Sequence, residues 1–389
     1  MKLIYISHMR FPSERTHSTF AMKTCESFAR KGIDVELWVP RRRNAAFIGV
    51  DPFAYHGIAK LFRIRRFPAL DLIRYAGPYG NFILASTFGV CIFFYAVAAR
   101  LHRSALFYGH DPYDMVLLFL IRARVFVEIH EIYGSYTRYP RFIRWIFSSM
   151  AGCITTNRHK KNALRDITGI PDQRIMYVQN AVDVGRFQIE LPREEARMRL
   201  KLPLHKKIFL YTGHLFDWKG RDTLFEAHRF LNGEEMLYLV GGTQRDSSEF
   251  QRRVDQAHAE NIVLIGERPH GEIPLWLRAA DVLLVPHSGK FDIARFEASP
   301  VKLFEYMASG RPIVVSDLPS IREIADGSMV WFCEPDNPKS FVDSIHSALA
   351  EKTESEHKAK KAREEVLQYT WEMRSQRIID FIRSVSGAI

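Results

Sequence analysis

One stretch, Phe296 to Val315, restricts the fold of this chain more than any other. It reads FEASPVKLFEYMASGRPIVV. Ser299 and Pro300 are typical of an N-cap and the first position of a helix, because Ser accepts a hydrogen bond from a free amide and Pro has its backbone angle pre-set. Gly310 is typical of a helix end, and Ile313–Val315 is a β-branched run typical of a buried strand. We therefore expect a helix that feeds a strand of a parallel sheet.

The same alternation of short apolar runs and helical patterns recurs along the chain. Gly, His, Asn or another polar residue follows most of the runs, which is where ligands bind in open α/β sheets. The pattern predicts an α/β fold with doubly wound, Rossmann-like sheets. The expected strands are Lys2–Ser7, Val35–Val39, Ala105–Tyr108, Arg124–Ile129, Gly152–Thr155, Ile175–Val178, Ile208–Thr212, Leu237–Val240, Ile262–Ile265, Val282–Val285 and Met329–Phe332.

The length of 389 residues allows two domains, each with its own core. Residues 187–206 are charged and contain Pro, so they are the best domain boundary. We expect one domain over 1–190 and a second over 200–370. The final helix, near Trp371 to Val385, is expected to return to the first domain, which then includes 371–389.

Two segments of the first half depart from this alternation. Residues 44–80 are rich in Arg, Pro and aromatic side chains and are interpreted as an irregular insertion. The run Phe82–Ala99 has no charge over 18 residues, which is the lower limit for a membrane span. It contains Ser, Thr and Gly and lies between strand-like segments, so we interpret it as a buried helix in preference to a transmembrane one.

Composition indicates a soluble globular protein, with 47% hydrophobic and 25% charged residues. The four cysteines are far apart and have no metal-ligand spacing, which favours a reduced, cytoplasmic compartment. The segment after Met1 and Lys2 is too short for a signal-peptide core and is expected to be a strand.

The net charge of +11 is unevenly distributed. Residues 1–186 contain 27 Lys and Arg against 13 Asp and Glu, a net charge of +14. This excess is either a solvated surface or a face that meets anionic lipid or a phosphorylated acceptor. We favour contact with lipid on the inner side of the cytoplasmic membrane, because aromatic residues interleave with the first two clusters. No nucleic-acid-binding motif accompanies it. The clusters are Arg41-Arg42-Arg43, Arg63-Arg65-Arg66, Arg138-Arg141-Arg144 and Arg158-Lys160-Lys161.

The motifs of the second half resemble a known enzyme family. They are Asn180-Ala181-Val182-Asp183, Gly213 with Lys219-Gly220, Gly241-Gly242, and the pair Glu297 and Glu305 around PVKLFEYMASGRPIV. Together they resemble retaining glycosyltransferase family 4 (glycosyl transferases group 1), which has the GT-B fold of two Rossmann-like domains facing across a cleft. The resemblance covers almost the whole chain and is densest from 205 to 333.

A nucleotide-sugar donor would need a separate contact for each of its parts. Lys219 and the amides of Val301 and Lys302 at a helix start can balance the charge of the pyrophosphate. Glu305 can accept the ribose hydroxyls, and the resemblance gives Glu297 the donor sugar. No Asp-x-Asp metal motif is present, so we expect neither a metal nor another cofactor.

The chain departs from the family in two loops. His214 stands where the family often has an Arg before the Lys, and it is a candidate to replace that Arg as a phosphate contact. The first loop lacks paired glycines and contains Arg15, Thr16 and His17, of which Arg15 can act on phosphate by charge. At two strand ends, His130 matches a family histidine near the reacting centre, and His110 is a weaker candidate for the acceptor side.

The resemblance implies a glycosyltransferase that retains anomeric configuration and serves polysaccharide biosynthesis. The donor is a nucleotide sugar held by the second domain. A lipid-linked or cell-surface glycan is the expected acceptor, held by the first. Two alternatives remain: another GT-B enzyme, such as a sugar-nucleotide epimerase or a phosphorylase, and a non-catalytic, membrane-associated nucleotide-sugar binder. Fold analogy supplies neither the base, the sugar nor the acceptor.

Overall fold

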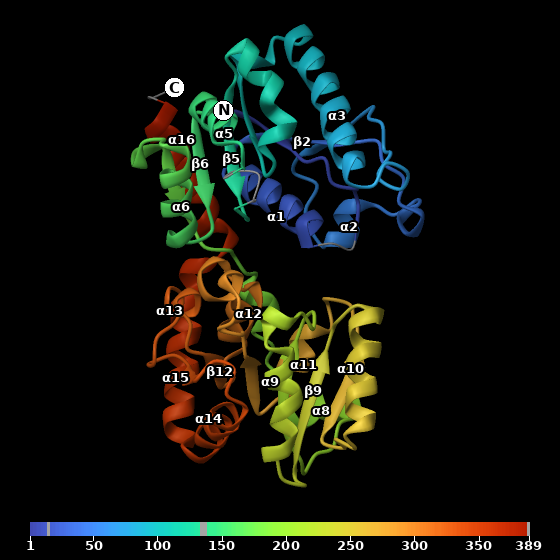
Figure 1. The fold of residues 1–389 in the computed structure, drawn as a ribbon, viewed down its shortest axis with the longest axis vertical. Helices are drawn as coiled ribbons and strands as arrows, with labels where there is room; N and C mark the ends of the chain where they lie inside the picture. The colour runs from blue at the N-terminus through green and yellow to red at the C-terminus, as the bar shows by residue number, and fades with distance from the viewer. Residues whose placement is uncertain (14–15, 133–137, 387–389) are drawn as a thin grey trace. The chain divides into compact units, whose positions relative to one another are not determined.

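The computed structural model describes residues 1–13, 16–132 and 138–386. The chain divides into two compact units, Met1–Gln179 with Trp371–Ile389, and Asn180–Thr370 (Figure 1). The division thus falls before the predicted boundary at 187–206. The segment 187–206 begins at the last residue of helix α7 (Val184–Phe187) and contains helix α8 (Arg193–Leu200). Both helices belong to the second unit, because Val184, Phe187 and Ala196 are buried in it.

The first unit is built on a parallel sheet with the strand order β3-β2-β1-β4-β5-β6-β7. Its strands are β1 (Lys2–Ile6), β2 (Asp34–Pro40), β3 (Arg63–Phe67), β4 (Ala105–Gly109), β5 (Arg124–Ile129), β6 (Gly152–Thr155) and β7 (Ile175–Tyr177). Its helices are α1 (Thr16–Arg30), α2 (Pro52–His56), α3 (Pro78–Ala98), α5 (Pro140–Ser149), α6 (Arg158–Thr168) and α16 (Trp371–Ser386).

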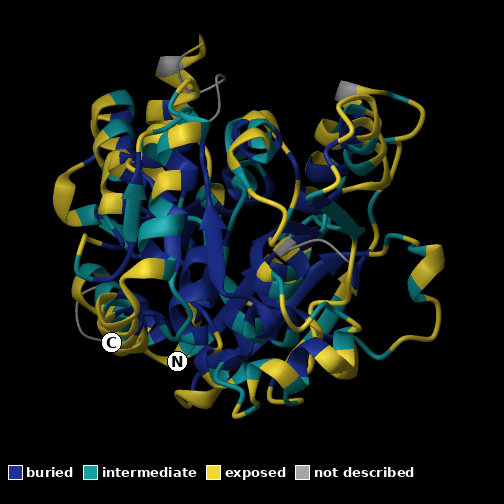
Figure 2. Ribbon diagram, turned by 90° about the horizontal axis from the view of Figure 1, so that it is seen from below, coloured by how far each residue is buried: buried dark blue, intermediate teal, exposed yellow. Residues whose placement is uncertain are grey.

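Both faces of this sheet are covered, because side chains of a strand alternate between them. Leu3 and Tyr5 of β1 join the core under α1 and α16, whereas Ile4 and Ile6 join the core under α3 and α5. Figure 2 shows the central strands coloured as buried while the outer turns of the helices are exposed. The strand order reverses between β1 and β4, and such a switch point leaves a crevice at the carboxyl ends of the strands.

Two predictions for the first unit are wrong. Residues 44–80 are not irregular throughout, since they contain α2 and the edge strand β3, which pairs with β2. The run Phe82–Ala99 does form a helix, α3, but only 33% of its most apolar window is buried. Leu84, Phe88, Ile92 and Ala96 pack inward at a helical spacing, and the opposite face is exposed. Because this helix is apolar all round, its sequence does not mark which face the core takes.

The second unit repeats this architecture with the order β10-β9-β8-β11-β12-β13. Its strands are β8 (Lys207–Thr212), β9 (Glu235–Val240), β10 (Ile262–Gly266), β11 (Val282–Val285), β12 (Ile313–Ser316) and β13 (Trp331–Cys333). Its further helices are α9 (Arg221–Glu226), α10 (Gln244–Gln256), α11 (Ile273–Ala279), α12 (Val301–Ser309), α13 (Pro319–Arg322), α14 (Pro338–Ala350) and α15 (Lys352–Glu365). Here the strand order reverses between β8 and β11.

The last helix, α16, belongs to the first unit through one buried ion pair. Arg374 Nη2 lies 2.5 Å from Glu128 Oε1, and both side chains are at most 2% exposed. Burial opposes ionisation of Glu128, but Arg374 together with His130 and His110 outweighs burial and holds the pKa of that carboxyl well below its usual range. Ser27 adds hydrogen bonds from α1 to Ser375 and to the carbonyl of Trp371. The end of the chain is therefore fixed to the strand that precedes His130.

Replacing Arg374 by Met should lower the free energy of unfolding by about 3–5 kcal/mol, because Glu128 would remain buried without its cation. Urea denaturation at pH 7 measures this. The exposed Arg383→Met on the same helix is the control, with an expected change below about 0.5 kcal/mol. Since the pKa of Glu128 is depressed, the loss should shrink as the pH falls below 4 and the carboxyl protonates. Equal losses in the two variants at pH 7 would contradict this role.

Candidate functional site

In the second unit, the loops after β8, β9 and β11 meet at the switch point. Gly213, Gly241 and Gly242 have backbone angles φ of 119°, 118° and 87°, which side chains rarely tolerate. A Cβ on Gly241 would lie 2.8 Å from the carbonyl oxygen of Gly213, so the two loops approach through bare backbone. A Cβ on Gly220 would lie 1.6 Å from the carbonyl oxygen of Pro286. These glycines bring three strand ends close together.

Unpaired cationic side chains surround these glycines. Lys302 Nζ is buried, has no hydrogen-bond partner among the described residues, and lies 3.7 Å from the centre of the Tyr211 ring. It is 3.5 Å from the point where Gly213 would carry a Cβ. Burial and the charge of Lys219 lower the pKa of Lys302 well below its usual value. Burial lowers the pKa of Lys219 to about 8. Two ammonium groups without a carboxylate partner are costly to bury, which is a property of anion-binding sites.

His287, which follows β11, completes this cationic cluster. It is fully buried, and neither of its ring nitrogens has a hydrogen-bond partner in the described part of the chain. Burial and the charge of Lys302 lower its pKa well below the usual value, so the ring is neutral. A neutral imidazole donates one hydrogen bond and accepts another without adding charge. In the sequence this histidine stands shortly after the expected strand Val282–Val285 and belongs to none of the predicted motifs.

Helix α12 begins one residue later than predicted. Pro300, in an extended conformation, is its N-cap, and Val301 is its first residue. Ser299 therefore does not cap the helix, and its hydroxyl makes no hydrogen bond to a described residue. Its carbonyl instead accepts a hydrogen bond from the side chain of Asn180. The predicted end at Gly310 is confirmed, with φ of 67°. The amides of Val301 and Lys302 lie in the first turn, where no helical carbonyl can satisfy them.

The two glutamates flank this helix start differently. Glu305 is buried on α12, and its Oε1 accepts a hydrogen bond of 3.0 Å from Nε2 of the half-exposed His270. Glu297 is half-buried at the end of the turn Ile293–Glu297. His214, the substitute phosphate contact, is exposed and stacks on Phe216 at 5.1 Å. His270 was missed because it follows β10 in a loop without any recognisable motif.

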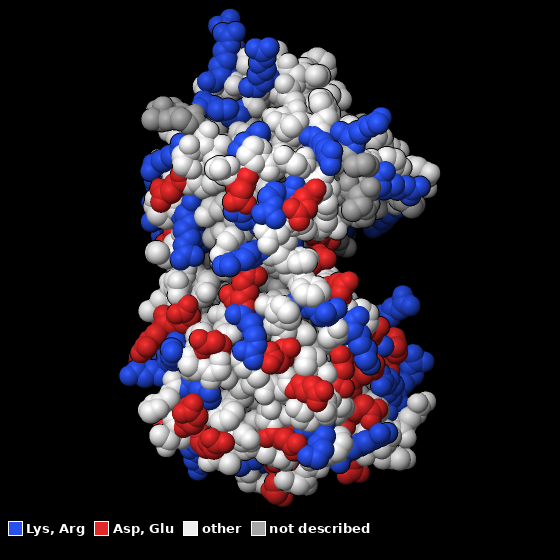
Figure 3. All heavy atoms as spheres, turned by 60° about the vertical axis from the view of Figure 1, so that its left-hand side comes forward, with Lys and Arg blue, Asp and Glu red and all other residues white. Residues whose placement is uncertain are grey.

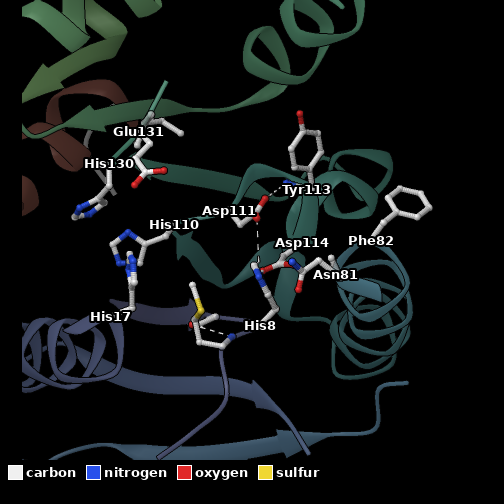
Figure 4. A pocket seen from close by; sticks show the side chains of 14 residues that line it. His8, His17, Asn81, Phe82, His110, Asp111, Tyr113, Asp114, His130 and Glu131 are labelled. Carbon is white, nitrogen blue, oxygen red and sulfur yellow. Dashed lines mark hydrogen bonds and ion pairs between the residues drawn. The ribbon is translucent and has the colours of Figure 1, made fainter. Parts of the chain in front are cut away.

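The first unit has a cavity of about 450 Å³ at its own switch point. It is lined by the loops after β1, β4 and β5, by the start of α1 and by one face of α3 (Figure 4). The lining residues are Ser7, His8, Met9, His17, Asn81, Phe82, Ala85, His110, Asp111, Tyr113, Asp114, Ile129, His130 and Glu131.

Histidines gather at one end of this cavity. Nε2 of His130 lies 2.8 Å from Oε1 of the buried Glu128, and its ring centre lies 4.5 Å from that of His110. His110 shares a short hydrogen bond with the Tyr5 hydroxyl. Burial and His130 lower the pKa of His110 well below its usual value. His17 lies with them, with its ring centre 6.3 Å from that of His130. The sequence thus predicted three histidines that the fold brings together.

Two other predicted residues are not placed by the structure. Arg15 lies outside the described residues, and Thr16 begins α1 with a side chain that is not described. The prediction that the basic clusters lie on the surface is wrong for Lys160. It is buried, and its Nζ donates to the carbonyl of His130 at 2.8 Å and to Thr156. Arg65 also has a partner within the first unit, because its Nε donates a hydrogen bond of 3.2 Å to Glu36.

His110, Glu128 and His130 also have the geometry of a metal site, since their ligand atoms lie within 4.8 Å of one another. The Glu128 carboxylate, however, is bound by Arg374 and by the Tyr108 hydroxyl. A divalent cation there would have to sit beside a buried guanidinium, which is electrostatically unfavourable. The arrangement is better suited to holding the ring of His130 in one orientation.

The overall fold is GT-B, as shown by similarity to solved structures over almost the whole chain. Anabaena HepE in complex with UDP matches with a TM-score of 0.74 at 16% identity, over 99% of this chain and 100% of that one. WaaG, a glycosyltransferase involved in lipopolysaccharide biosynthesis, matches with a TM-score of 0.69 at 15% identity, over 99% of this chain and 100% of that one.

Sequence comparison gives a family match for the second unit. Residues 192–366 match the family model described as Glycosyl transferases group 1, and this range lies within the unit Asn180–Thr370. The D-inositol 3-phosphate glycosyltransferase of Corynebacterium urealyticum is 23% identical over 54% of this chain and 51% of its own length. The lipopolysaccharide core biosynthesis mannosyltransferase LpsB of Rhizobium meliloti is 25% identical over 55% and 59%. The chain therefore spans about half the length of these curated relatives.

The cavity gives a pH prediction through His8. Burial opposes its charge, but Asp114, whose Oδ2 accepts from Nδ1 at 2.7 Å, outweighs this and raises the pKa of His8 to about 9. A raised pKa contributes stability that is complete below pH 6.5 and is lost as the pH rises through 9. We expect the stability advantage of the wild type over His8→Gln to shrink by roughly 1–3 kcal/mol between pH 6.5 and 9.5 in urea denaturation. A constant difference would refute the ion pair.

Proposed function

We propose that this protein is a retaining glycosyltransferase that uses a nucleoside-diphosphate sugar and acts in polysaccharide biosynthesis. The observation that carries the proposal is the group of unpaired cations at the switch point of the second unit. The ammonium group of Lys302 is buried and Lys219 is half-buried, neither forms an ion pair with a carboxylate of the described residues, and both lie beside glycine loops that leave their backbone open. A pyrophosphate supplies the missing negative charge.

The remaining donor contacts follow from the same helix. The amides of Val301 and Lys302 face the pyrophosphate. Glu305 accepts hydrogen bonds from the ribose hydroxyls, and His270 either turns away from this carboxylate or keeps its own hydrogen bond to it. Glu297 takes the donor sugar. Support comes from the group 1 family match over 192–366 and from the UDP complex of HepE, a protein with the same fold.

In the proposed reaction, an acceptor hydroxyl attacks the anomeric carbon from the face that the diphosphate leaves. The bond between that carbon and the phosphate oxygen breaks, and the hydroxyl proton passes to the departing phosphate. Lys219 stabilises the charge that develops on this oxygen. His130 contacts the sugar being transferred. No protein general base is assigned, and neither a metal nor another cofactor takes part in the proposal.

Lys302→Met gives a sharp test, because its two effects have opposite signs. Removing an unpaired buried ammonium should raise the free energy of unfolding by about 1–3 kcal/mol. The same change should weaken UDP binding at least about tenfold, since a charged phosphate contact is lost. Urea denaturation and titration calorimetry measure the two quantities. Lys339→Met, an exposed residue on α14, is the control and should change neither.

Turnover would be assayed with a panel of nucleotide sugars, first screened by thermal shift. Glu305→Ala should weaken donor binding, and Lys219→Ala should slow transfer. The product should have the anomeric configuration of the donor in its proton NMR spectrum, and activity should survive EDTA. Normal transfer by both variants would refute the donor site. Donor binding without acceptor-dependent release of nucleoside diphosphate would favour the non-catalytic alternative.

We further propose that the first unit lies on an anionic membrane surface, at the inner face of the cytoplasmic membrane. The exposed face of α3 carries Phe82 and Phe94, which are 70% and 64% exposed. Helix α5 exposes Phe142 and Trp145 next to Arg141 and Arg144. Aromatic and basic side chains on one helix face are typical of helices that lie in the interface of a bilayer.

The charge distribution supports the same partner. Residues 72–110 and 132–165 contain no Asp or Glu, and they include both α3 and α5. On the face shown in Figure 3, Lys and Arg predominate over the first unit, whereas Asp and Glu are frequent over the second. Anionic lipid headgroups attract such a surface by about 1 kcal/mol per basic residue near it.

Charge reversal on α5 tests the membrane proposal. Arg141→Glu with Arg144→Glu should reduce binding to phosphatidylglycerol-containing vesicles at least about tenfold in a sedimentation assay at low salt. Arg245→Glu with Arg252→Glu on α10 makes the same charge change in the second unit and should have little effect. Wild-type binding should also weaken as salt increases. Equal binding of wild type to neutral and anionic vesicles would remove the proposal.

A further inference from the structure

The cavity of the first unit has a polar end built from carboxylates, opposite its histidines. His8 lies between two of them, with Nδ1 2.7 Å from Asp114 Oδ2 and 3.9 Å from Asp111 Oδ2 (Figure 4). Asp111 accepts a hydrogen bond of 2.9 Å from the amide of Tyr113. The carboxylates are thus held in place by the loop after β4 and by a histidine from the loop after β1.

One acceptor atom in this cluster is left for a ligand. Asp114 is 2% exposed, and its Oδ1 has no hydrogen-bond partner among the described residues. An unpaired carboxylate oxygen at such a depth is costly unless a donor arrives. Nδ1 of His110, at the histidine end, is also buried without a described partner. The cavity therefore presents unpaired polar atoms at both ends.

The charge of the cavity lining limits which ligand can donate a hydrogen bond to Asp114. The described lining residues include no Lys or Arg. Their cation is His8, and it faces Asp111 and Asp114 while Glu131 stands at the edge. Burial and Asp114 raise the pKa of Asp111 to about 6, so it is largely ionised at pH 7.5. The cavity is net negative, and a phosphate would be repelled there, in contrast to the cationic cluster around Lys302.

An aromatic side chain completes the cavity on its open side. Phe82 of α3 lines it and is 70% exposed, whereas Ala85, one turn further along the helix, is buried. Carboxylates that accept hydroxyl hydrogens, next to an apolar ring that covers C–H groups, suit an uncharged polyhydroxy ring. Most of the lining residues are polar, which suits a ligand that carries many hydroxyl groups.

We propose that this cavity is the acceptor subsite and that it takes an uncharged sugar residue, whose hydroxyls donate to Asp114 Oδ1 and Asp111 and whose apolar face rests on Phe82. The inference rests on the proposed glycosyl transfer and narrows its acceptor. The sugar ring that enters carries no phosphate, unlike the acceptor named for the inositol-phosphate relatives. Any anionic or lipid part of the acceptor stays outside the cavity.

Saturation-transfer NMR with the full chain and UDP present tests this assignment. The probes are the methyl glycosides of glucose, galactose, mannose and N-acetylglucosamine, together with the 6-phosphates of the same four methyl glycosides. At least one neutral probe should bind, and its 6-phosphate should bind at least about tenfold more weakly, which corresponds to about 1.4 kcal/mol. A 6-phosphate that binds as tightly as its neutral partner overturns the proposal.

Variants on α3 separate the cavity from the rest of the helix. Phe82→Ser should weaken binding of the neutral probe at least about fivefold. Phe94→Ser, equally exposed but outside the lining, should leave it unchanged. Asp114→Asn should also weaken it, while UDP binding stays intact in all three. The proposal is overturned if the two Phe variants bind the neutral probe equally well. It is also overturned if the wild type binds UDP but binds none of the neutral probes. Failure of UDP to bind the wild type would instead refute the donor function.

Discussion

The buried ion pair between Glu128 and Arg374 is the interaction on which the first unit depends. It joins a residue of β5 to one that follows it by 246 positions, on the last helix. The same carboxylate lies 2.8 Å from His130, so the group that fixes α16 also fixes a proposed site residue. Burying both charges is costly, and removing either partner costs more than the pair contributes, so the chain end and the site are coupled.

The two units carry side chains of opposite charge at the switch points of their sheets. Each has its switch point between the first strand of its sheet and the strand that reverses the order. In the second unit the polar groups there are the cations Lys219 and Lys302, which form no ion pair with a carboxylate among the described residues. In the first unit they are carboxylates around the cation His8. One architecture thus presents an anion site and a site for uncharged hydroxyl groups, because the loops, and not the sheets, carry the chemistry.

Several site residues were predictable because their positions follow from local rules. Gly213, Gly241 and Gly242 follow strands, and a helix start with a Lys in its first turn follows Glu297. Other residues were not predictable. His8 and Asp114 are 106 positions apart and pair only across neighbouring strands. Glu128 lies in a largely apolar strand, and such a position indicates that the carboxylate is buried with a cationic partner. The sequence does not show that this partner is Arg374.

The sequence by itself determined the alternation of strands and helices, the end of α12 at Gly310 and the glycine-rich strand ends, because short-range backbone preferences decide these features. It also determined the charge excess of residues 1–186. Only the tertiary structure decided that α3 exposes one apolar face, that Lys160 is buried and that Glu305 meets His270. These depend on which segments pack together, and packing between residues far apart in sequence leaves no local pattern to read.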